Sequence, residues 1–229
     1  MVSYIIPYVE SRYDQLEHNL NSLDNQTDMD FEVMLVCQNC TCDITRPYMT
    51  KINITVVGQN PAKAQNVGVD NANGDIVVLT SPEVINAQEN VAEMKKITDN
   101  TFWLGRVVEE GIEDISFASS QWNRENLLTI KGERHGVVAL CIEEYFHPWA
   151  YFIGVIKKAD FLSAGGVNEA YMDGIAWEDR AFSDAVTTSG SSISLNSNIV
   201  GIHLKHPRTY QADSGALRAK NKVLYYGSK

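Results

Sequence analysis

The sequence lacks the features that mark several large protein classes. No apolar run approaches the roughly 20 residues that span a bilayer, and no basic region followed by an apolar stretch opens the chain. We therefore expect a soluble, cytoplasmic protein with no membrane span. Basic residues are also scarce, because 19 Lys and Arg oppose 29 Asp and Glu and leave a net charge of -10. This charge disfavours general binding to nucleic acid or to anionic membranes.

Cysteine is sparse as well, with four in the chain. Cys37, Cys40 and Cys42 crowd one short stretch, and Cys141 lies far downstream. A closed zinc site would need one more Cys or His close to the first three, and none is present. The spacing favours free thiols, which suit a reducing cytoplasm.

Repeats, low-complexity tracts and linkers are absent from the sequence. The 229 residues, of which 44% are hydrophobic, suffice for one substantial core. We expect a single domain over residues 1–229. Its last part, residues 201–229, is rich in Lys and Arg and is interpreted as a solvated tail, with an anion-binding segment as the alternative.

Short apolar runs alternate with helical spacing over residues 1–80. Strands are predicted at 2–7, 31–36, 52–57 and 76–79, and helices around Leu16, Leu20 and Leu23 and at 62–72. This alternation predicts an α/β fold, with a mostly parallel central sheet flanked by helices on both faces. Ligands of such sheets bind beyond the carboxyl ends of the strands, here the loops after Ile6, Val36 and Leu79.

The second half of the sequence is less regular. A helix is predicted at 85–100, strands at 130–131, 137–142, 152–156 and 199–202, and a short helical turn at 158–161. Gly165-Gly166 closes that turn.

Five blocks of sequence occur in an informative order. They are Ser3-Tyr4-Ile5-Ile6-Pro7-Tyr8, Asp30 to Val36, Ala64-Gln65-Asn66-Val67-Gly68 with Ala72 to Leu79, Gly154 to Glu169, and Gly174-Ile175-Ala176-Trp177-Glu178-Asp179-Arg180-Ala181-Phe182. In this order they resemble the family-2 glycosyltransferases with the GT-A (nucleotide-diphospho-sugar transferase) fold, over roughly the whole chain. The resemblance implies a nucleotide-sugar-binding half at 1–84 and an acceptor-side half at 101–200.

The resemblance also implies where the donor nucleotide lies. The implied donor residues are Pro7, Tyr8, Glu10, Arg12, Gln38, Asn39, Lys63, Gln65, Asn66 and Ser81. Gln38 and Asn39 stand where the family usually carries acidic residues, so neutral hydrogen bonds would hold the base. Gln65 replaces the usual arginine, and Lys63 is the nearby cation. Ordinary surface placement is the alternative for Glu10 and Arg12.

A metal site is expected after the strand at 76–79. The family carries Asp-x-Asp there, whereas this chain has Thr80-Ser81-Pro82-Glu83. Related enzymes place a histidine on the metal or the diphosphate at the position of His203, with His206 close behind. Imidazole binds manganese acceptably and magnesium prefers oxygen, so we expect Mn²⁺, with Mg²⁺ as the alternative, on Glu83, His203 and His206. Otherwise Glu83 caps a helix after Pro82.

The acidic pair Glu178-Asp179 is the most specific signal in the chain. By resemblance it opens a helix, with Asp179 as the general base and Glu178 as the group that orients acceptor hydroxyls. The helix N-terminus is expected to keep both carboxylates ionised, and Trp177 offers a flat face for a sugar ring. The alternative is a capping pair beside a core tryptophan.

These expectations combine into one function. The chain would transfer a sugar from a nucleotide diphosphate, with a UDP-sugar as the default, to a hydroxyl with inversion at the anomeric carbon. The acceptor could be a glycan, a lipid-linked glycan, a protein or a modified nucleic acid, bound near Gly165, Gly166, His147 and Trp149. The alternatives are a non-catalytic nucleotide- or sugar-binding relative and a nucleotidyltransferase-like enzyme. The latter usually has a glycine-rich phosphate loop, and Pro7 to Arg12 contains no glycine.

Overall fold

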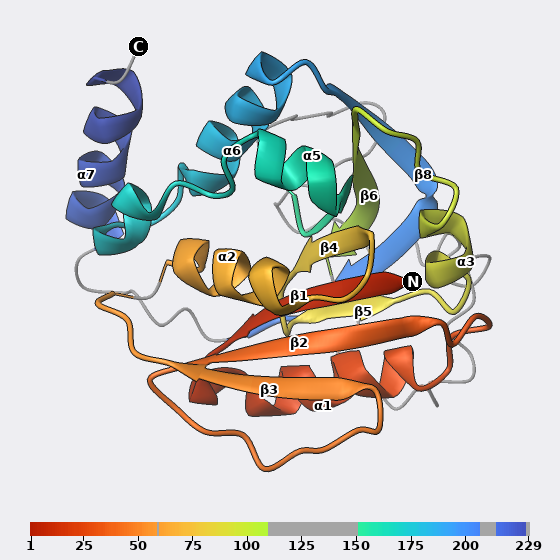
Figure 1. Cartoon of the computed structure of the whole chain (residues 1–229). Coiled ribbons are helices and arrows are strands. Elements are labelled where there is room, and N and C mark those ends of the chain that lie inside the picture. The colour runs from red at the N-terminus through yellow and green to blue at the C-terminus, as the bar shows by residue number, and fades with distance from the viewer. Residues whose placement is uncertain (59, 110–150, 207–213, 228–229) are drawn as a thin grey trace.

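The computed structural model describes residues 1–58, 60–109, 151–206 and 214–227 (Figure 1). The strands are β1 (Val2–Tyr8), β2 (Phe31–Gln38), β3 (Met49–Ile54), β4 (Ile76–Thr80), β5 (Val84–Asn86), β6 (Thr101–Glu109), β7 (Ile153–Lys157) and β8 (Ser192–His203). The α-helices are α1 (Tyr13–Leu23), α2 (Ala62–Asn71), α3 (Asn90–Met94), α5 (Lys158–Ser163), α6 (Glu178–Thr188) and α7 (Ser214–Gly227), and η1 (Glu10–Arg12) and η4 (Glu169–Asp173) are 3₁₀ helices.

Within these ranges the strands form one sheet in the order β3-β2-β1-β4-β7-β6-β8-β5. β1 pairs in parallel with β2 and β4, and β2 pairs in parallel with β3. β7 runs antiparallel to both of its neighbours, β4 and β6. Helices α1 and α2 supply the crossovers that parallel neighbours need. The predicted mostly parallel sheet with flanking helices is confirmed.

Helices cover both faces of the sheet, with α1 on one face and α2, α5 and α6 on the other (Figure 1). Leu16 and Leu20 of α1 are fully buried in one apolar cluster with Tyr4 of β1. The next residue, Ile5, points to the other face, where it joins a second cluster with Phe182 of α6. β1 is buried on both sides, which explains its nearly continuous apolar sequence.

Close packing of α2 onto β1 depends on a glycine. A Cβ atom at Gly68 would lie 2.4 Å from Cγ2 of Ile5. Real Cβ atoms do not approach that closely, so this position leaves no room for a side chain.

The structure corrects two predicted elements. Residues 85–100 are not one helix, because Val84–Asn86 form β5, which pairs with β8, and only α3 follows. The third strand lies at Met49–Ile54 rather than 52–57, because pairing with β2 sets its register and Asn39 holds both main-chain polar groups of Val56 outside the sheet. The strands predicted at 130–131 and 137–142 lie outside the described residues.

The segment interpreted as a solvated tail contains helix α7, which ends at Gly227. Its residues Asn221 and Tyr225 are buried against the rest of the protein. Among the described helices, none combines the length and apolar character needed to cross a membrane.

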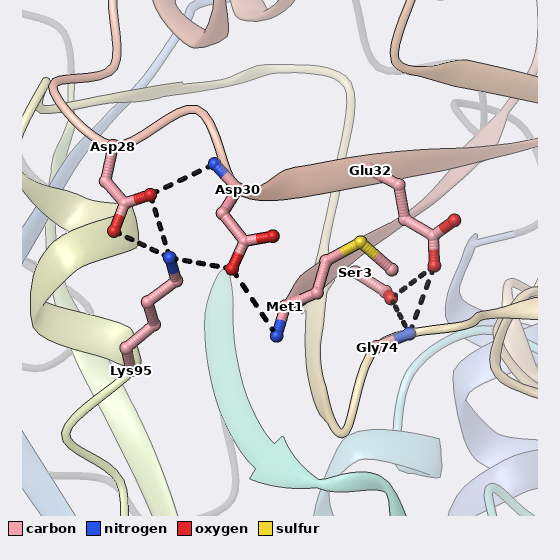
Figure 2. A network of polar contacts seen from close by, with 7 residues as sticks. All are labelled: Met1, Ser3, Asp28, Asp30, Glu32, Gly74 and Lys95. Carbon is pink, nitrogen blue, oxygen red and sulfur yellow. Dashed lines mark hydrogen bonds and ion pairs between the residues drawn. The ribbon is translucent and has the colours of Figure 1, made fainter.

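A polar network ties the amino end of the sheet together (Figure 2). The Glu32 carboxylate accepts hydrogen bonds from Ser3 Oγ at 2.7 Å, from the Asn73 N–H at 2.5 Å and from the Gly74 N–H at 3.2 Å. Beside it, Lys95 binds Asp28 and Asp30. Burial raises the pKa of Glu32, but the hydrogen bonds lower it by more, so its pKa lies below its usual value.

We expect Glu32→Gln to lower the free energy of unfolding by about 1–2 kcal/mol at pH 7, because the loop before β4 loses a charged acceptor. A carboxylate with a depressed pKa stabilises the fold above its unfolded pKa, and this contribution disappears as the pH falls through the folded pKa. The difference between variant and wild type should therefore shrink below pH 4, as measured by urea unfolding. Glu17→Gln, at an exposed position of α1, is the control, and equal effects of both substitutions would refute the role of the network.

Candidate functional site

Strands β1, β2 and β4 end at the same edge of the sheet, at Tyr8, Gln38 and Thr80. Three side chains at this edge have buried polar atoms with no hydrogen-bond partner: Gln38 Oε1, Thr80 Oγ1 and Ser81 Oγ. Buried polar atoms are almost always paired in native proteins. Unpaired atoms at the carboxyl ends of parallel strands are available to a bound ligand.

The other predicted donor residues divide by what they contact. Glu10 is exposed at the start of η1, and Arg12 is buried at its end. Pro7 and Tyr8 are buried within β1, so the Tyr8 ring belongs to the core. Lys63 donates to the Thr55 carbonyl at 3.4 Å.

The remaining donor candidates serve loops or are buried. The Asn66 amide bonds both main-chain polar groups of Val167, at 2.8 and 2.9 Å, and so fixes the turn at Gly165-Gly166 to α2. The Asn39 amide likewise bonds both main-chain polar groups of Val56. Gln65 is buried in α2 with its Oε1 unpaired. The donor roles of these residues stay predictions.

The three predicted metal ligands lie together. One ligand atom from each of Glu83, His203 and His206 falls within 4.8 Å of the other two. Glu83 Oε1 lies 3.9 Å from His203 Nε2 and 3.5 Å from His206 Nε2. Glu83 is brought there by β5, since the Leu204 N–H donates to the Glu83 carbonyl at 2.8 Å and Val84 pairs with His203. Because a strand and not a helix follows Pro82, Glu83 caps no helix.

The electrostatics of this cluster suit a divalent cation. Burial, and after it the charges of His206 and Arg12, lowers the pKa of His203 to about 4. His203 is therefore neutral near pH 7, the form that binds metals. Two imidazoles and one carboxylate are a donor set that fits manganese better than magnesium.

The acidic pair opens α6, as predicted. Trp177 precedes it in the left-handed conformation, at φ 76°. The Glu178 carboxylate accepts a hydrogen bond from Asn60 Nδ2 at 2.8 Å, and Asn60 Oδ1 in turn accepts from the Ala62 N–H at 3.0 Å. Asp179 Oδ1 accepts from the Arg180 N–H at 2.8 Å. Asn60 therefore connects the start of α2 to the start of α6.

The expectation that the helix N-terminus keeps both carboxylates ionised is wrong for Asp179. Burial, and after it the charge of the neighbouring Glu178, raises the pKa of Asp179 to about 7, against the lowering effect of the Arg180 N–H. Burial also raises the pKa of Glu178. Loss of water around two adjacent carboxylates outweighs the local helix dipole, whose effect is modest. A carboxyl that titrates near neutrality is suited to exchange a proton in a reaction.

The two residues just before β7 lie near the acidic pair and the metal cluster. The Tyr151 ring packs edge-on against Phe102 at 5.3 Å, and the charges of Asp179 and Glu178, after burial, raise the pKa of its hydroxyl. Phe152, the next residue, lies on the other face of the sheet, with its ring 4.4 Å from that of His203. Tyr151 thus senses the acidic pair, and Phe152 contacts a residue of the metal cluster.

The predicted acceptor residues are not all gathered at the acidic pair. Gly165 and Gly166 line a cavity of about 770 Å³ with residues of η4, α6 and α7, and neither carboxylate of the pair is among its described lining residues. Trp177 packs its ring against Tyr225 of α7 at 5.3 Å. His147 and Trp149 lie outside the described residues.

Sequence reasoning missed two residues of the site. Asn60 has a local signal, since an asparagine two residues before a helix often accepts from its first N–H groups, but its bond to Glu178 depends on the tertiary fold. Tyr151 has no such signal. Its buried hydroxyl has no hydrogen-bond partner, a feature visible only in three dimensions.

Neither a family model nor a curated protein matches the sequence. Solved structures do match its fold. S. aureus TarS 1-349 in complex with UDP-GlcNAc matches with a TM-score of 0.66 and 15% identity over 97% of this chain and 65% of that one. The same fragment with UDP matches at 0.60 and 16% identity, over 89% of this chain and 60% of that one.

A longer S. aureus TarS chain matches with a TM-score of 0.60 and 17% identity. The match covers 89% of this chain and 36% of the TarS chain. This chain thus spans 36–65% of the TarS chains that it matches. Identities this low carry the fold and not the chemistry. The chain has the GT-A-type α/β fold that its sequence blocks predict.

Proposed function

We propose that this chain is a glycosyltransferase that moves a sugar from a nucleotide diphosphate to an acceptor hydroxyl. The observation that carries the proposal is the presence of two groups, one near Tyr151 and the other near Phe152, the adjacent residues just before β7. One is an acidic pair in which burial raises the pKa of Asp179 to about 7, and the other is the Glu83, His203 and His206 cluster. TarS, whose fold this chain shares, has been crystallised with UDP and with UDP-GlcNAc, which supports a UDP-sugar as the donor.

In the proposed reaction Asp179 acts as the general base. Its carboxylate takes the proton of the acceptor hydroxyl while the acceptor oxygen forms a bond to the anomeric carbon. The bond from that carbon to the diphosphate oxygen breaks, and its electron pair leaves with the nucleotide diphosphate. Attack from the face opposite the leaving group inverts the anomeric configuration. Asp179 then releases its proton to solvent.

The surrounding residues prepare this step. Glu178, held by Asn60 at 2.8 Å, orients acceptor hydroxyls, and its charge keeps the pKa of Asp179 high enough for proton uptake. A divalent cation on Glu83, His203 and His206 would supply positive charge to the donor diphosphate. Arg12, buried beside His203, adds a fixed cation on the same side. The polar atoms of Gln38 and Ser81 are the groups that we assign to the nucleotide.

Ligand-dependent melting tests this function directly. We expect UDP and UDP-GlcNAc, with manganese, to raise the melting temperature, because a ligand at 100 times its dissociation constant adds about 2.7 kcal/mol of stability. Guanosine and adenosine diphosphate sugars are the matched controls. Release of UDP then tests turnover, and NMR of the glycosidic product tests inversion. Binding without turnover would indicate a non-catalytic relative, and no response to any nucleotide sugar would overturn the proposal.

A further inference from the structure

The turn that leads into the acidic pair has an unfavourable backbone. Ala176 and Trp177 both have positive φ, at 61° and 76°. A left-handed conformation is unfavourable for a residue with a Cβ atom, and here two occur in succession immediately before Glu178. Surrounding contacts must therefore hold such a turn in place.

Helix α7 supplies those contacts through one side chain. Asn221 is 1% exposed, and its Nδ2 donates to the Tyr171 carbonyl at 3.0 Å and to the Ala176 carbonyl at 2.8 Å. The two carbonyls stand at opposite ends of the segment 171–176. One turn earlier in α7, the Leu217 carbonyl accepts from the Ile175 N–H at 3.3 Å. The segment is thus fixed to α7 at three main-chain atoms.

The opposite side of the turn is shaped to admit Asn221. A Cβ atom at Gly174 would lie 2.1 Å from Asn221 Oδ1, and the three nearest heavy atoms to it all belong to Asn221. Gly174 has an extended backbone, at φ -132°, which any residue adopts. The glycine is therefore explained by the space that Asn221 occupies and not by its own conformation.

Aromatic and cationic contacts extend the attachment to the catalytic helix. The Trp177 ring lies 5.3 Å from Tyr225 and 5.6 Å from Tyr226. The Arg180 guanidinium lies 4.9 Å from the centre of the Tyr225 ring. Tyr225 also donates a hydrogen bond to Asp184 of α6. Contacts to α7 therefore surround Glu178 and Asp179 on both sides in sequence.

We propose that α7, through Asn221, is a positioning element that fixes the turn at Ala176-Trp177 and so places Asp179 against the acceptor hydroxyl. The catalytic part of this inference rests on the proposed function. Asn221 touches no reacting atom, and its effect passes through the main chain of residues 171–177. The segment interpreted from sequence as a solvated tail thereby becomes part of the active-site framework.

Three variants test the proposal: Asn221→Ala, Gly174→Ala and their combination. Asn221→Ala removes both hydrogen bonds, and Gly174→Ala displaces the Asn221 side chain, so each should lower kcat about 10- to 100-fold with an unchanged KM for the donor. The double variant should be no worse than Asn221→Ala, because the new methyl group enters the vacated space. The acid limb of the pH profile should move in each variant, which a purely structural defect would not cause. Lys222→Ala, on the exposed side of α7, is the control.

Two measurements separate this inference from the proposed function. Hydrogen exchange of the Ile175 and Ala181 amides, which bond to Leu217 and Trp177, should accelerate in both single variants while β1 stays protected. UDP affinity with manganese should not change. Asn221→Asp, of equal size, tests loss of the donors without a cavity if Asn221→Ala does not fold.

The outcomes are distinct. A wild type with no turnover of any donor would refute the proposed function, and the exchange data would still test the attachment to α7. An active wild type whose variants keep its kcat, its pH profile and its exchange rates would overturn the positioning role. Additive losses in the double variant would also overturn it.

Discussion

Asp179→Asn is expected to lower kcat about a thousandfold or more while it makes the protein more stable above pH 7. The loss follows from the proposed role, since an amide cannot take the acceptor proton, and removal of a general base typically costs at least a hundredfold. Wild-type kcat/KM should rise with pH along an acid limb near 7, where Asp179 loses its proton. UDP release over pH 5–9 measures both effects.

The contribution of the Asp179 carboxyl to stability has the opposite pH dependence to that of Glu32. Because burial raises the pKa of Asp179 in the folded state, its contribution to stability is complete below the unfolded pKa and is lost as the pH rises through about 7. The asparagine does not titrate. We therefore expect the variant to be more stable by about 1–3 kcal/mol at pH 8, and by less than half of that at pH 5.

Urea unfolding at pH 5 and pH 8 measures the gain. Asp70→Asn, an exposed aspartate on α2, is the control and should change neither activity nor stability at either pH. Full activity of Asp179→Asn would refute its role as the base. A gain of equal size at both pH values would refute the raised pKa.

Removal of the bound metal ion should also have a large effect on the reaction. A chelator is expected to abolish turnover, with manganese restoring it better than magnesium, because histidine ligands suit manganese. His203→Ala and Glu83→Gln should each weaken manganese binding at least 10-fold, because each removes one of three ligands. Titration calorimetry with manganese alone measures this without an active enzyme.

His18→Ala is the matched control, since His18 is exposed on α1, and it should bind manganese as the wild type does. Full activity in excess chelator would contradict the role of the cluster in the reaction. Unchanged manganese affinity in both cluster variants would contradict the site itself.

The parts of the structure that the sequence predicts correctly are those with local signals. Leu16 and Leu20 follow the helical period, and β1 and β4 are apolar runs, so their type and position follow from spacing alone. β5 cannot be predicted from spacing, because three residues are too few to show a periodicity. They form a strand only because they pair with β8. The boundary of β3 likewise depends on its partner β2.

The site shows the same division between local and tertiary information. Glu83 and His203, which the sequence predicts as metal ligands, lie in one cluster. Glu178-Asp179 opens a helix, as expected. The prediction that Asp179 stays ionised is wrong because it rests on the helix N-terminus, which is a local feature. The burial that raises its pKa depends on the whole fold. The contact of Asn221 with the Ala176 carbonyl has no counterpart in sequence patterns, since it joins elements that are distant along the chain.

The location of the metal cluster also has a consequence for the outer edge of the sheet. β5 is a three-residue strand at the end of the strand order, with β8 as its only sheet neighbour among the described strands. So short an edge strand gains little from its own ladder. An ion shared by Glu83 and the two histidines would link the residue before this strand to the end of β8, and would stabilise the folded state, in which the three ligands lie together. The same ion would then serve the reaction and stabilise the edge of the sheet. Depletion of the ion would therefore destabilise β5 before the strands of the core.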